Sequence, residues 1–223
     1  MLLETLAAPV AATGMFTLAW TMIAVPAVMA GLLLLGGKLT DRWGHLAGTA
    51  AVLWSFAIAA CLFGEQLIRP ASERAVSAHL YTWFGVGEWT FEVGLLVDQL
   101  SILFALLITG VGSLIHIYSI GYMAHDDRRR RFFAYLNLFI AAMLILVLAD
   151  NYIVLFVGWE GVGLASYLLI SFWQHKPSAA AAGVKAFVMN RVGDLGLLMA
   201  ISTMLAMFGS SSFTDVNAGA HEL

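Results

Sequence analysis

The chain has 223 residues, of which 61% are hydrophobic and only 11% are charged, and its formal net charge is −3. Soluble domains are about 25% charged, so this composition indicates an integral membrane protein without a sizeable soluble domain. The charge balance offers no basic surface for nucleic acid. Cys61 is the only cysteine, which excludes an internal disulfide, a cysteine-rich zinc site and a four-cysteine iron–sulfur site.

The apolar runs predict an all-α membrane protein with about six spanning helices. The expected spans are 6–35, 46–68, 95–122, 132–148, 152–173 and 179–208. Together, residues 1–208 are expected to form one transmembrane helical domain. Residues 209–223 are polar and are interpreted as a tail or as the start of a missing remainder. Pro26 lies inside the first span and should kink it.

Residues 80–93, between the second and third spans, are predicted to form a short β-hairpin on the membrane surface. Trp89, Phe91 and Val93 alternate with polar residues, and Gly85-Val86-Gly87 can supply the turn. An irregular loop with anchoring aromatic residues is the alternative. After the hairpin, Asp98 falls in the first turns of the third span, where a carboxylate favours a helix N-terminus.

Lysine and arginine are concentrated in alternate loops. One set of loops holds Lys38, Arg42, Arg128, Arg129, Arg130, Arg131 and Lys176, and the other set holds only Arg69 and Arg74. By the positive-inside rule, the N-terminus, the hairpin and the turn at Asp150 face outward. The run 128–131 is interpreted as a topology signal in preference to a lipid or partner site. The two-residue turn Asp150-Asn151 makes the fourth and fifth spans an antiparallel pair.

Glu160 is the most informative single residue, because it places a carboxylate well inside the apolar fifth span. An acidic side chain at the centre of a membrane helix costs on the order of 2.5–3.5 kcal/mol on insertion scales, and such residues are usually functional. Gly158, Gly161 and Gly163 surround it and allow a neighbouring helix or water to approach. A carboxylate that only hydrogen-bonds a neighbouring helix for packing is the alternative.

The sixth span carries three further charges, Lys185, Arg191 and Asp194, together with Asn190. Arg191 and Asp194 are three residues apart and can meet on one helix face. Lys185 is the cation expected to be available to Glu160 within this chain. A polar line with titratable side chains indicates proton transfer, and a structural ion-pair cluster is the alternative. For His116, late in the third span, a packed and hydrogen-bonded side chain is preferred to a proton carrier.

Several of these segments resemble chain L of the proton-translocating NADH:quinone oxidoreductase, respiratory complex I. The matching segments are Phe132–Phe139 (FFAYLNLF), Leu148–Tyr152 (LADNY), Gly158–Gly163 (GWEGVG), Lys185–Phe187 (KAF) and Asn190–Asp194 (NRVGD). The resemblance covers residues 98–208 in motif order and spacing. The first 97 residues match only in hydropathy and in having a hairpin after the second span. Other antiporter-like chains of complex I and the large subunit of multisubunit Na⁺/H⁺ antiporters share the Trp-Glu pair.

The resemblance implies the N-terminal part of an antiporter-like helical bundle that pumps protons while quinone is reduced elsewhere in the complex. Glu160 then matches the carboxylate at the start of the proton path, and Lys185, Arg191 and Asp194 match charged positions of the sixth helix. No cofactor is expected in this chain; NADH, FMN, iron–sulfur clusters and quinone are expected in partner subunits. The implied partners are other membrane-arm subunits, especially neighbouring antiporter-like chains, and the lipid bilayer.

Family members run to roughly 600 residues, so the chain is expected to be the N-terminal portion of a longer protein; a natural short form is the alternative. A bacterial cytoplasmic membrane is the expected location, with the N-terminus outward. Two other functions remain open at this point. They are a subunit of a multisubunit cation/proton antiporter and a membrane subunit that transports nothing.

Overall fold

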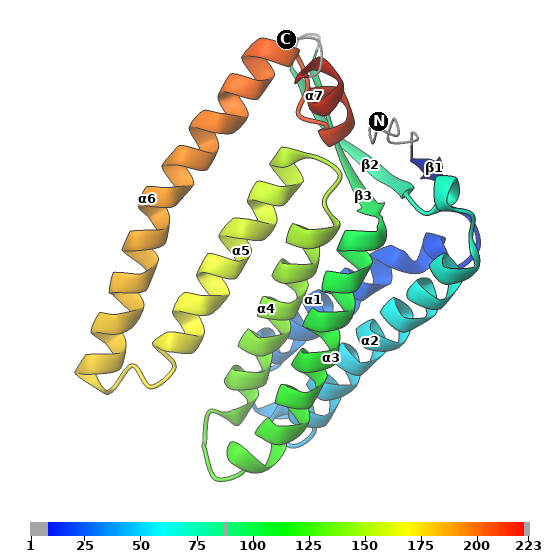
Figure 1. Ribbon diagram of the computed structural model, residues 1–223. Coiled ribbons are helices and arrows are strands. Elements are labelled where there is room, and N and C mark those ends of the chain that lie inside the picture. Colours follow the sequence, from blue (N-terminus) through cyan, green and yellow to red (C-terminus); the bar gives the residue numbers. More distant parts are fainter. Residues whose placement is uncertain (1–8, 87–88, 221–223) are drawn as a thin grey trace.

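The computed structural model describes residues 9–86 and 89–220, which form six long helices, a three-stranded sheet and a short final helix (Figure 1). The long helices are α1 (Ala19–Leu35), α2 (Gly44–Ile68), α3 (Gln99–Tyr122), α4 (Arg129–Leu148), α5 (Tyr152–Ile170) and α6 (Pro177–Phe208). Each is long and apolar enough to cross a membrane, when α1 is taken with the 3₁₀ turn η1 (Gly14–Leu18) that precedes it. The expected fold class is therefore confirmed.

Helix α4 lies at the centre of the bundle. It packs against α1, α2 and α3 on one side and against α5 on the other. Helix α6 packs mainly against α5 and against the short helix α7 (Phe213–Ala220), so it forms the outer edge of the bundle (Figure 1). This position explains why only three of its residues, Gly183, Asp194 and Ile201, are buried.

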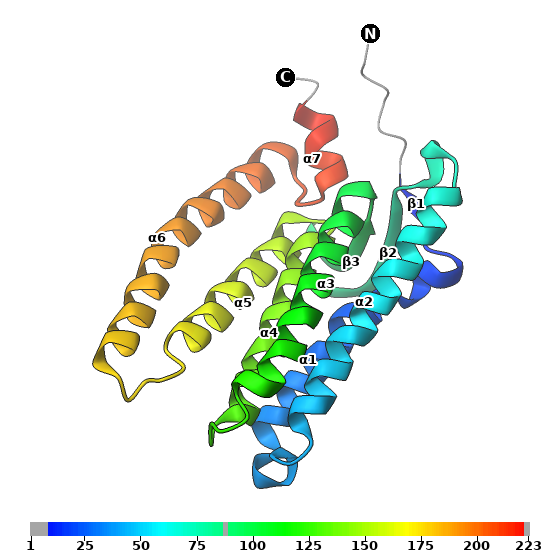
Figure 2. The ribbon, with the colours of Figure 1, turned by 60° about the horizontal axis from the view of Figure 1, so that its bottom comes forward.

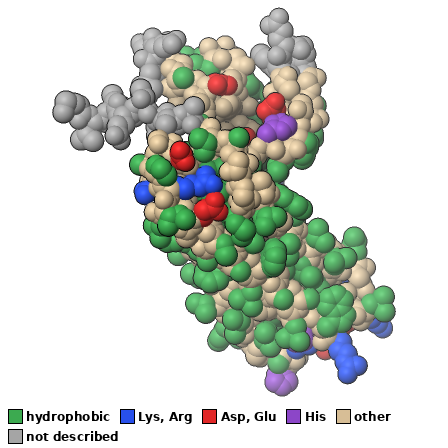
Figure 3. Space-filling view, turned by 90° about the vertical axis from the view of Figure 1, so that its right-hand side faces the viewer, with side chains coloured by type: hydrophobic (Ala, Val, Ile, Leu, Met, Phe, Trp, Pro, Cys, Tyr) green, Lys and Arg blue, Asp and Glu red, His purple; other side chains and the backbone are tan. Residues whose placement is uncertain are grey.

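The molecule has two polar ends separated by an apolar middle. The loops between α1 and α2, α3 and α4, and α5 and α6 lie at one end, and the sheet, the α4–α5 turn and α7 lie at the other (Figures 1 and 2). Figure 3 shows hydrophobic side chains covering the middle of one face, with charged side chains gathered toward its two ends. This distribution is the one that a bilayer-spanning protein requires.

Local sequence signals set the helix boundaries. Asp98 accepts a hydrogen bond from the Ser101 backbone at 2.7 Å, and the Ser101 hydroxyl accepts one from the Asp98 backbone at 2.8 Å, so a capping box starts α3. Asn151 caps α5 by accepting from the backbone of Ile153 and Val154. Gly209 ends α6 at φ 69°, a conformation that favours glycine.

The first span begins later than the expected residue 6. Residues Val10–Ala11 form strand β1, and the helical part begins only with η1 at Gly14. Strand β1 donates from Val10 N to Ala75 O at 2.9 Å, so the segment before Gly14 completes a sheet instead of entering the bilayer. Residues 1–8 lie outside the described part of the chain.

The hairpin is longer than the expected range 80–93. Strand β2 runs from Val76 to Val86, β3 runs from Trp89 to Val97, and the sheet order is β1-β2-β3 with β1 parallel to β2. The third span accordingly begins at Gln99 and not at residue 95, because the apolar segment up to Val97 is paired with Val76 in the sheet. The predicted turn residue Gly87 lies outside the described residues.

Residues after α6, expected as a polar tail, fold back over the α4–α5 turn. The Tyr152 backbone donates to Ser211 O at 2.9 Å, and the Phe213 backbone donates to Asp150 O at 3.2 Å. The rings of Tyr152 and Phe213 lie edge to face, 4.6 Å apart. Helix α7 is therefore attached to the start of α5 as well as to the end of α6.

Buried polar side chains link α3 and α4 inside the bundle. His116 is fully buried, with Nδ1 2.8 Å from Gly112 O and Nε2 3.2 Å from the Asn137 amide nitrogen. The expected interpretation of His116 as a packed, hydrogen-bonded side chain is confirmed. Because Nδ1 faces a carbonyl, it carries the proton, and Nε2 accepts from Asn137.

Candidate functional site

Glu160 forms an ion pair with Arg191, which lies on the adjacent helix. The guanidinium Nη1 of Arg191 lies 2.6 Å from each carboxylate oxygen of Glu160. The Glu160 side chain is three-quarters buried, whereas that of Arg191 is about half exposed. The pair joins α5 to α6 within their apolar lengths, where an ionised carboxylate needs a partner.

Arg191 also contacts two residues of its own helix. Its Nε lies 3.5 Å from the Asp194 carboxylate, so the pair expected from the three-residue spacing is present. Its guanidinium carbon lies 4.7 Å from the centre of the Phe187 ring, in a cation–π arrangement. One cation is thus shared between two carboxylates, and the contact with Glu160 is the shorter.

Asp194 is the most buried member of this cluster, with 4% of its surface exposed. Its Oδ1 accepts a hydrogen bond of 2.7 Å from the indole nitrogen of Trp159. Since Trp159 precedes Glu160 on α5, the two helices are joined by two adjacent polar links. This Trp159 contact leaves Asp194 with a partner even when Arg191 moves.

The cluster borders a cavity of about 350 Å³. It is lined by Met143, Leu146, Trp159, Glu160, Val162, Gly163, Phe187, Asn190, Arg191 and Asp194. Most of its wall is apolar, and the polar groups of Glu160, Asn190, Arg191 and Asp194 converge on it from α5 and α6. A space of this size accommodates several water molecules beside Glu160.

Two of the glycines around Glu160 bring α5 close to α4. A Cβ atom at Gly158 would lie 2.5 Å from the backbone nitrogen of Leu146, and one at Gly161 would lie 2.9 Å from the Ala142 Cβ. Gly163 is different, because its nearest atom, the Asn190 amide nitrogen, is 4.0 Å away. Close packing against α4 therefore fixes the height of Glu160 in the bundle.

Lys185 does not join the cluster, which corrects the expectation that it is the cation available to Glu160. It is exposed on α6, and no described carboxylate lies within 4.0 Å of it. It precedes Asp194 by nine residues, which is two and a half helical turns, so the two side chains leave opposite faces of α6. Arg191 occupies the position beside Glu160 that was expected for Lys185.

Two family models match the chain. The N-terminal model of chain 5 of NADH-ubiquinone oxidoreductase (complex I) matches residues 83–133. The transmembrane model of NADH:quinone oxidoreductase and Mrp antiporters matches residues 149–222, which include the whole Glu160 cluster. Subunit L of the NADH-quinone oxidoreductase of Mycobacterium tuberculosis (strain H37Rv) is 58% identical over 200 residues, which are 90% of this chain and 32% of that protein.

The chain belongs to the complex I subunit L family. The subunit L of Escherichia coli (strain K12) is 46% identical over 144 residues, which are 65% of this chain and 24% of that protein. The chain thus spans about a third or less of the length of these relatives.

Solved structures agree on the fold of this subunit L family member. The Mrp complex of Dietzia sp. has a chain that superposes with a TM-score of 0.72 at 25% identity, covering 89% of this chain and 20% of that one. An archaeal membrane-bound sulfane sulfur reductase superposes with the same TM-score at 16% identity, covering 88% of this chain and 38% of that one. The second likeness is one of fold alone.

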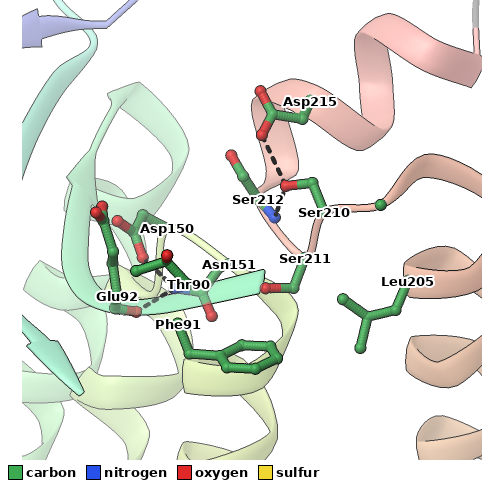
Figure 4. A pocket seen from close by; sticks show the side chains of 11 residues that line it. Thr90, Phe91, Glu92, Asp150, Asn151, Leu205, Ser210, Ser211, Ser212 and Asp215 are labelled. Atoms are coloured by element: carbon green, nitrogen blue, oxygen red, sulfur yellow. Dashed lines mark hydrogen bonds between the residues drawn. The ribbon is translucent and has the colours of Figure 1, made fainter. Parts of the chain in front are cut away.

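A second cavity, of about 250 Å³ and with a mostly polar wall, lies at the end of the subunit L fold that carries the sheet (Figure 4). Its walls come from β3, the α4–α5 turn, the end of α6, the start of α7 and the segment between these two helices. Asn151 donates to the Glu92 carbonyl at 3.0 Å and to the Asp150 carboxylate at 2.7 Å. Burial raises the pKa of the Asp150 carboxyl above its ordinary value, although hydrogen bonds from Asn151 and from the Gly94 backbone act in the opposite direction.

Sequence reasoning missed three contributors to the two polar sites. For Trp159 and Phe187, the only indication in the sequence is their distance from the charged residues. Trp159 adjoins Glu160, and Phe187 lies four residues before Arg191, on the same helix face. Asn151 was interpreted only as part of a turn. Its position immediately before an apolar run is the pattern of a helix cap, and this signal could have identified its role.

Proposed function

We propose that the chain is a proton-translocating membrane subunit of an NADH-quinone oxidoreductase, in which quinone reduction elsewhere in the complex drives proton pumping. Its subunit L relatives and the match of residues 149–222 to the antiporter-like family support this function. The observation that carries the proposal is Glu160, a carboxylate held in the membrane by a cation that a second carboxylate can also bind.

The geometry suggests how Glu160 exchanges a proton. While Arg191 lies against Glu160, the guanidinium stabilises the ionised carboxylate. When Arg191 moves toward Asp194, Glu160 is left as a largely buried carboxylate without a counter-charge, and this favours uptake of a proton from water in the adjacent cavity. Return of Arg191 favours release of that proton. Asp194 holds the displaced cation, and Trp159 keeps Asp194 in place.

We further propose the finer features of the assembly. NADH, FMN, iron–sulfur clusters and quinone bind partner subunits, and this chain contributes no redox chemistry. Its neighbours are other membrane-arm subunits, in particular further antiporter-like chains. The membrane is a bacterial cytoplasmic membrane, with the N-terminus outward and the arginine loop inward, as the distribution of lysine and arginine between the loops favours.

A subunit of a multisubunit cation/proton antiporter is the second candidate. It is favoured by the superposition on a chain of the Dietzia Mrp complex and by the family model that covers both classes. Purification of the native assembly separates the two candidates. Copurification of iron–sulfur and flavin subunits supports the first, whereas a set of small membrane subunits without redox groups supports the second.

The test of the proposed role is to replace Glu160 in the assembled complex. Glu160→Gln keeps the volume and hydrogen bonding of the side chain but fixes its charge at zero. We expect normal assembly, strongly reduced proton translocation in sealed vesicles, and reduced quinone reductase activity if the two are tightly coupled. Glu160→Asp keeps the titratable group and should retain part of the activity. Wild-type pumping by the glutamine variant, normalised to assembled complex, would assign Glu160 to packing alone.

A further inference from the structure

The four consecutive arginines at the start of α4 have different surroundings. Arg130 is anchored, because it pairs with Asp41 at 2.7 Å and donates to the Leu33 carbonyl. The side chains of Arg128, Arg129 and Arg131 form no ion pair or hydrogen bond with any residue in the described ranges. A topology signal explains why the run is basic, but it does not explain how two of these side chains come to line a common cavity.

That cavity lies between the start of α4 and the end of α5 and has a volume of about 70 Å³. It is lined by Arg128, Arg131, Tyr135, Tyr167, Leu168, Ser171, Phe172 and Gln174. Its polar side chains can donate hydrogen bonds, and none of its lining residues is acidic. The space is several times what a single water molecule needs, so it can admit a small anionic group.

The charged side chains that line this cavity are two arginines. Arg128 and Arg131 are three residues apart, and like charges at this spacing repel each other on a helix. The positive end of the α4 dipole lies beside the same arginines, whereas the negative end of the α5 dipole faces the cavity and offsets part of their charge. Arginine binds phosphate through paired N–H donors, so one phosphate group placed between the two guanidiniums would compensate both charges.

The nearest carboxylates serve a neighbouring cavity. Asp126 accepts from the Trp173 indole at 3.1 Å and from the backbone of Arg128 at 2.7 Å. Asp126 and Asp127 line the adjacent space, and Arg128 borders both that space and the cavity. The Lys176 ammonium, also in the adjacent space, lies 4.6 Å from the centre of the Trp173 ring. Neither carboxylate comes within 4.0 Å of the Arg128 or Arg131 guanidinium in the described structure.

The cavity also lies at the depth of lipid headgroups, because α4 begins at Arg129 and α5 ends at Ile170 beside it. We propose that this cavity binds the phosphate of an anionic phospholipid. Arg128 and Arg131 hold the phosphate, and the hydroxyls of Tyr135 and Tyr167 donate to it. Leu168 and Phe172 provide an apolar wall on the side where the lipid chains begin. Basic pockets between membrane helices are suited to this chemistry.

The experiment uses the full-length protein in its assembled complex, reconstituted in phosphatidylcholine vesicles with a photoactivatable phosphatidylglycerol as the probe. Crosslinked peptides are mapped by mass spectrometry, and the yield on the segments around Tyr135 and Tyr167 is measured against probe concentration. Each arginine near an anionic lipid strengthens binding about fivefold. Arg128→Gln or Arg131→Gln should therefore weaken binding about fivefold, and the double variant roughly thirtyfold.

Arg129→Gln is the matched control, because it removes a charge from the same run without touching the cavity. It should leave the yield unchanged; an equal loss would mean that general surface charge attracts the lipid, and would overturn the site. Gln174→Glu places a carboxylate in the cavity without altering an arginine and should also reduce the crosslinking yield. If Gln174→Glu crosslinks at the wild-type yield, the proposal is wrong.

Two further arms distinguish the source of the anion. Inorganic phosphate, added against chloride at constant ionic strength, should not displace the lipid; full displacement would assign the cavity to a soluble anion. Composition of the complex is compared between the wild type and the double variant. Loss of a partner subunit from the double variant, with no crosslink in the wild type, would assign the surface to a protein instead.

Discussion

Arg191 on α6 places one guanidinium nitrogen 2.6 Å from both carboxylate oxygens of Glu160 on α5. The same side chain lies 3.5 Å from Asp194. One cation is therefore shared by two acidic neighbours, one on the next helix and one on its own helix. The predictions on Arg191 and Asp194 test whether the two contacts serve transport or assembly.

Arg191→Gln should impair pumping because Glu160 then lacks its counter-charge. The lost charged hydrogen bonds are worth roughly 1.5–3 kcal/mol, toward the lower end here since Arg191 is half exposed. The double variant Glu160→Gln/Arg191→Gln should assemble better than Arg191→Gln alone, because no unpaired carboxylate remains. The measurement is the amount of subunit in purified complex, followed by pumping per complex. Equal assembly of the single and double variants would mean that the two residues are not coupled.

Asp194→Ala should lower the amount of assembled subunit. It removes the acceptor for the Trp159 indole and one partner of Arg191, and a hydrogen bond to a charged group contributes about 1.5–3 kcal/mol. Asp194→Asn retains an acceptor for Trp159 and should assemble better. Quantitative immunoblotting of the purified complex measures the amount of assembled subunit for both variants. Normal assembly of the alanine variant with lost pumping would place Asp194 in the transport path itself.

Gly158→Ala should destabilise the contact between α4 and α5. The added methyl group would meet the backbone of Leu146, which cannot rotate away, and overpacking of this kind costs about 1–3 kcal/mol. Gly163→Ala is the matched control on the same helix, since its nearest neighbour is at ordinary contact distance. Thermal stability of the purified complex should fall for the first variant only. Equal behaviour of the two variants would contradict the close helix contact.

Asp150 should make stability depend on pH. Its pKa is raised by burial, so the folded state binds the proton more tightly than the unfolded state. This contribution favours folding below the ordinary value of 3.8 and is lost as pH rises toward the raised folded pKa. Asp150→Asn should abolish this dependence and be relatively most favourable at neutral pH. Melting temperatures of both forms across the acidic range test this; parallel curves would contradict it.

Topology can be tested by cysteine labelling. In a Cys61→Ser background, Gly87→Cys and Ala124→Cys should react with a membrane-impermeant reagent from opposite sides of sealed vesicles. In the sequence, Gly87 falls between β2 and β3 and Ala124 between α3 and α4, so one span, α3, separates the two positions. The orientation proposed above makes Gly87 the outward site. Labelling of both positions from the same side would refute the expected topology.

The sequence was sufficient for features set by local patterns. Apolar length placed the six spans, and alternation of apolar and polar residues placed the hairpin, because both depend on neighbouring residues. The three-residue spacing of Arg191 and Asp194 likewise predicted their contact. The start of the first span was misjudged, since Val10 is apolar enough for a helix but pairs with a strand more than sixty residues away.

The partner of Glu160 could not be chosen from the sequence. Lys185 and Arg191 are both basic residues of the next helix, and only the rotation of α6 about its axis decides which one faces α5. That rotation is fixed by long-range contacts, such as the hydrogen bond between Trp159 and Asp194. The sequence does not reveal the cavity beside Arg128 and Arg131 for the same reason, because five of its eight lining residues come from α5 and the segment that follows it.

Because the segment after α6 is attached to α5, helix α6 can tilt about its own C-terminal end. The segment from Ser210 to Ser212 is attached to the start of α5 by backbone hydrogen bonds. Gly209 joins this segment to the end of α6 and is the point about which α6 can tilt. Arg191 is eighteen residues from Gly209, an arm of about 27 Å at 1.5 Å per residue. A tilt of about 5° at Gly209 that draws α6 away from α5 therefore carries Arg191 and Asp194 together by about 2 Å, which is enough to break their hydrogen bonds to Glu160 and Trp159.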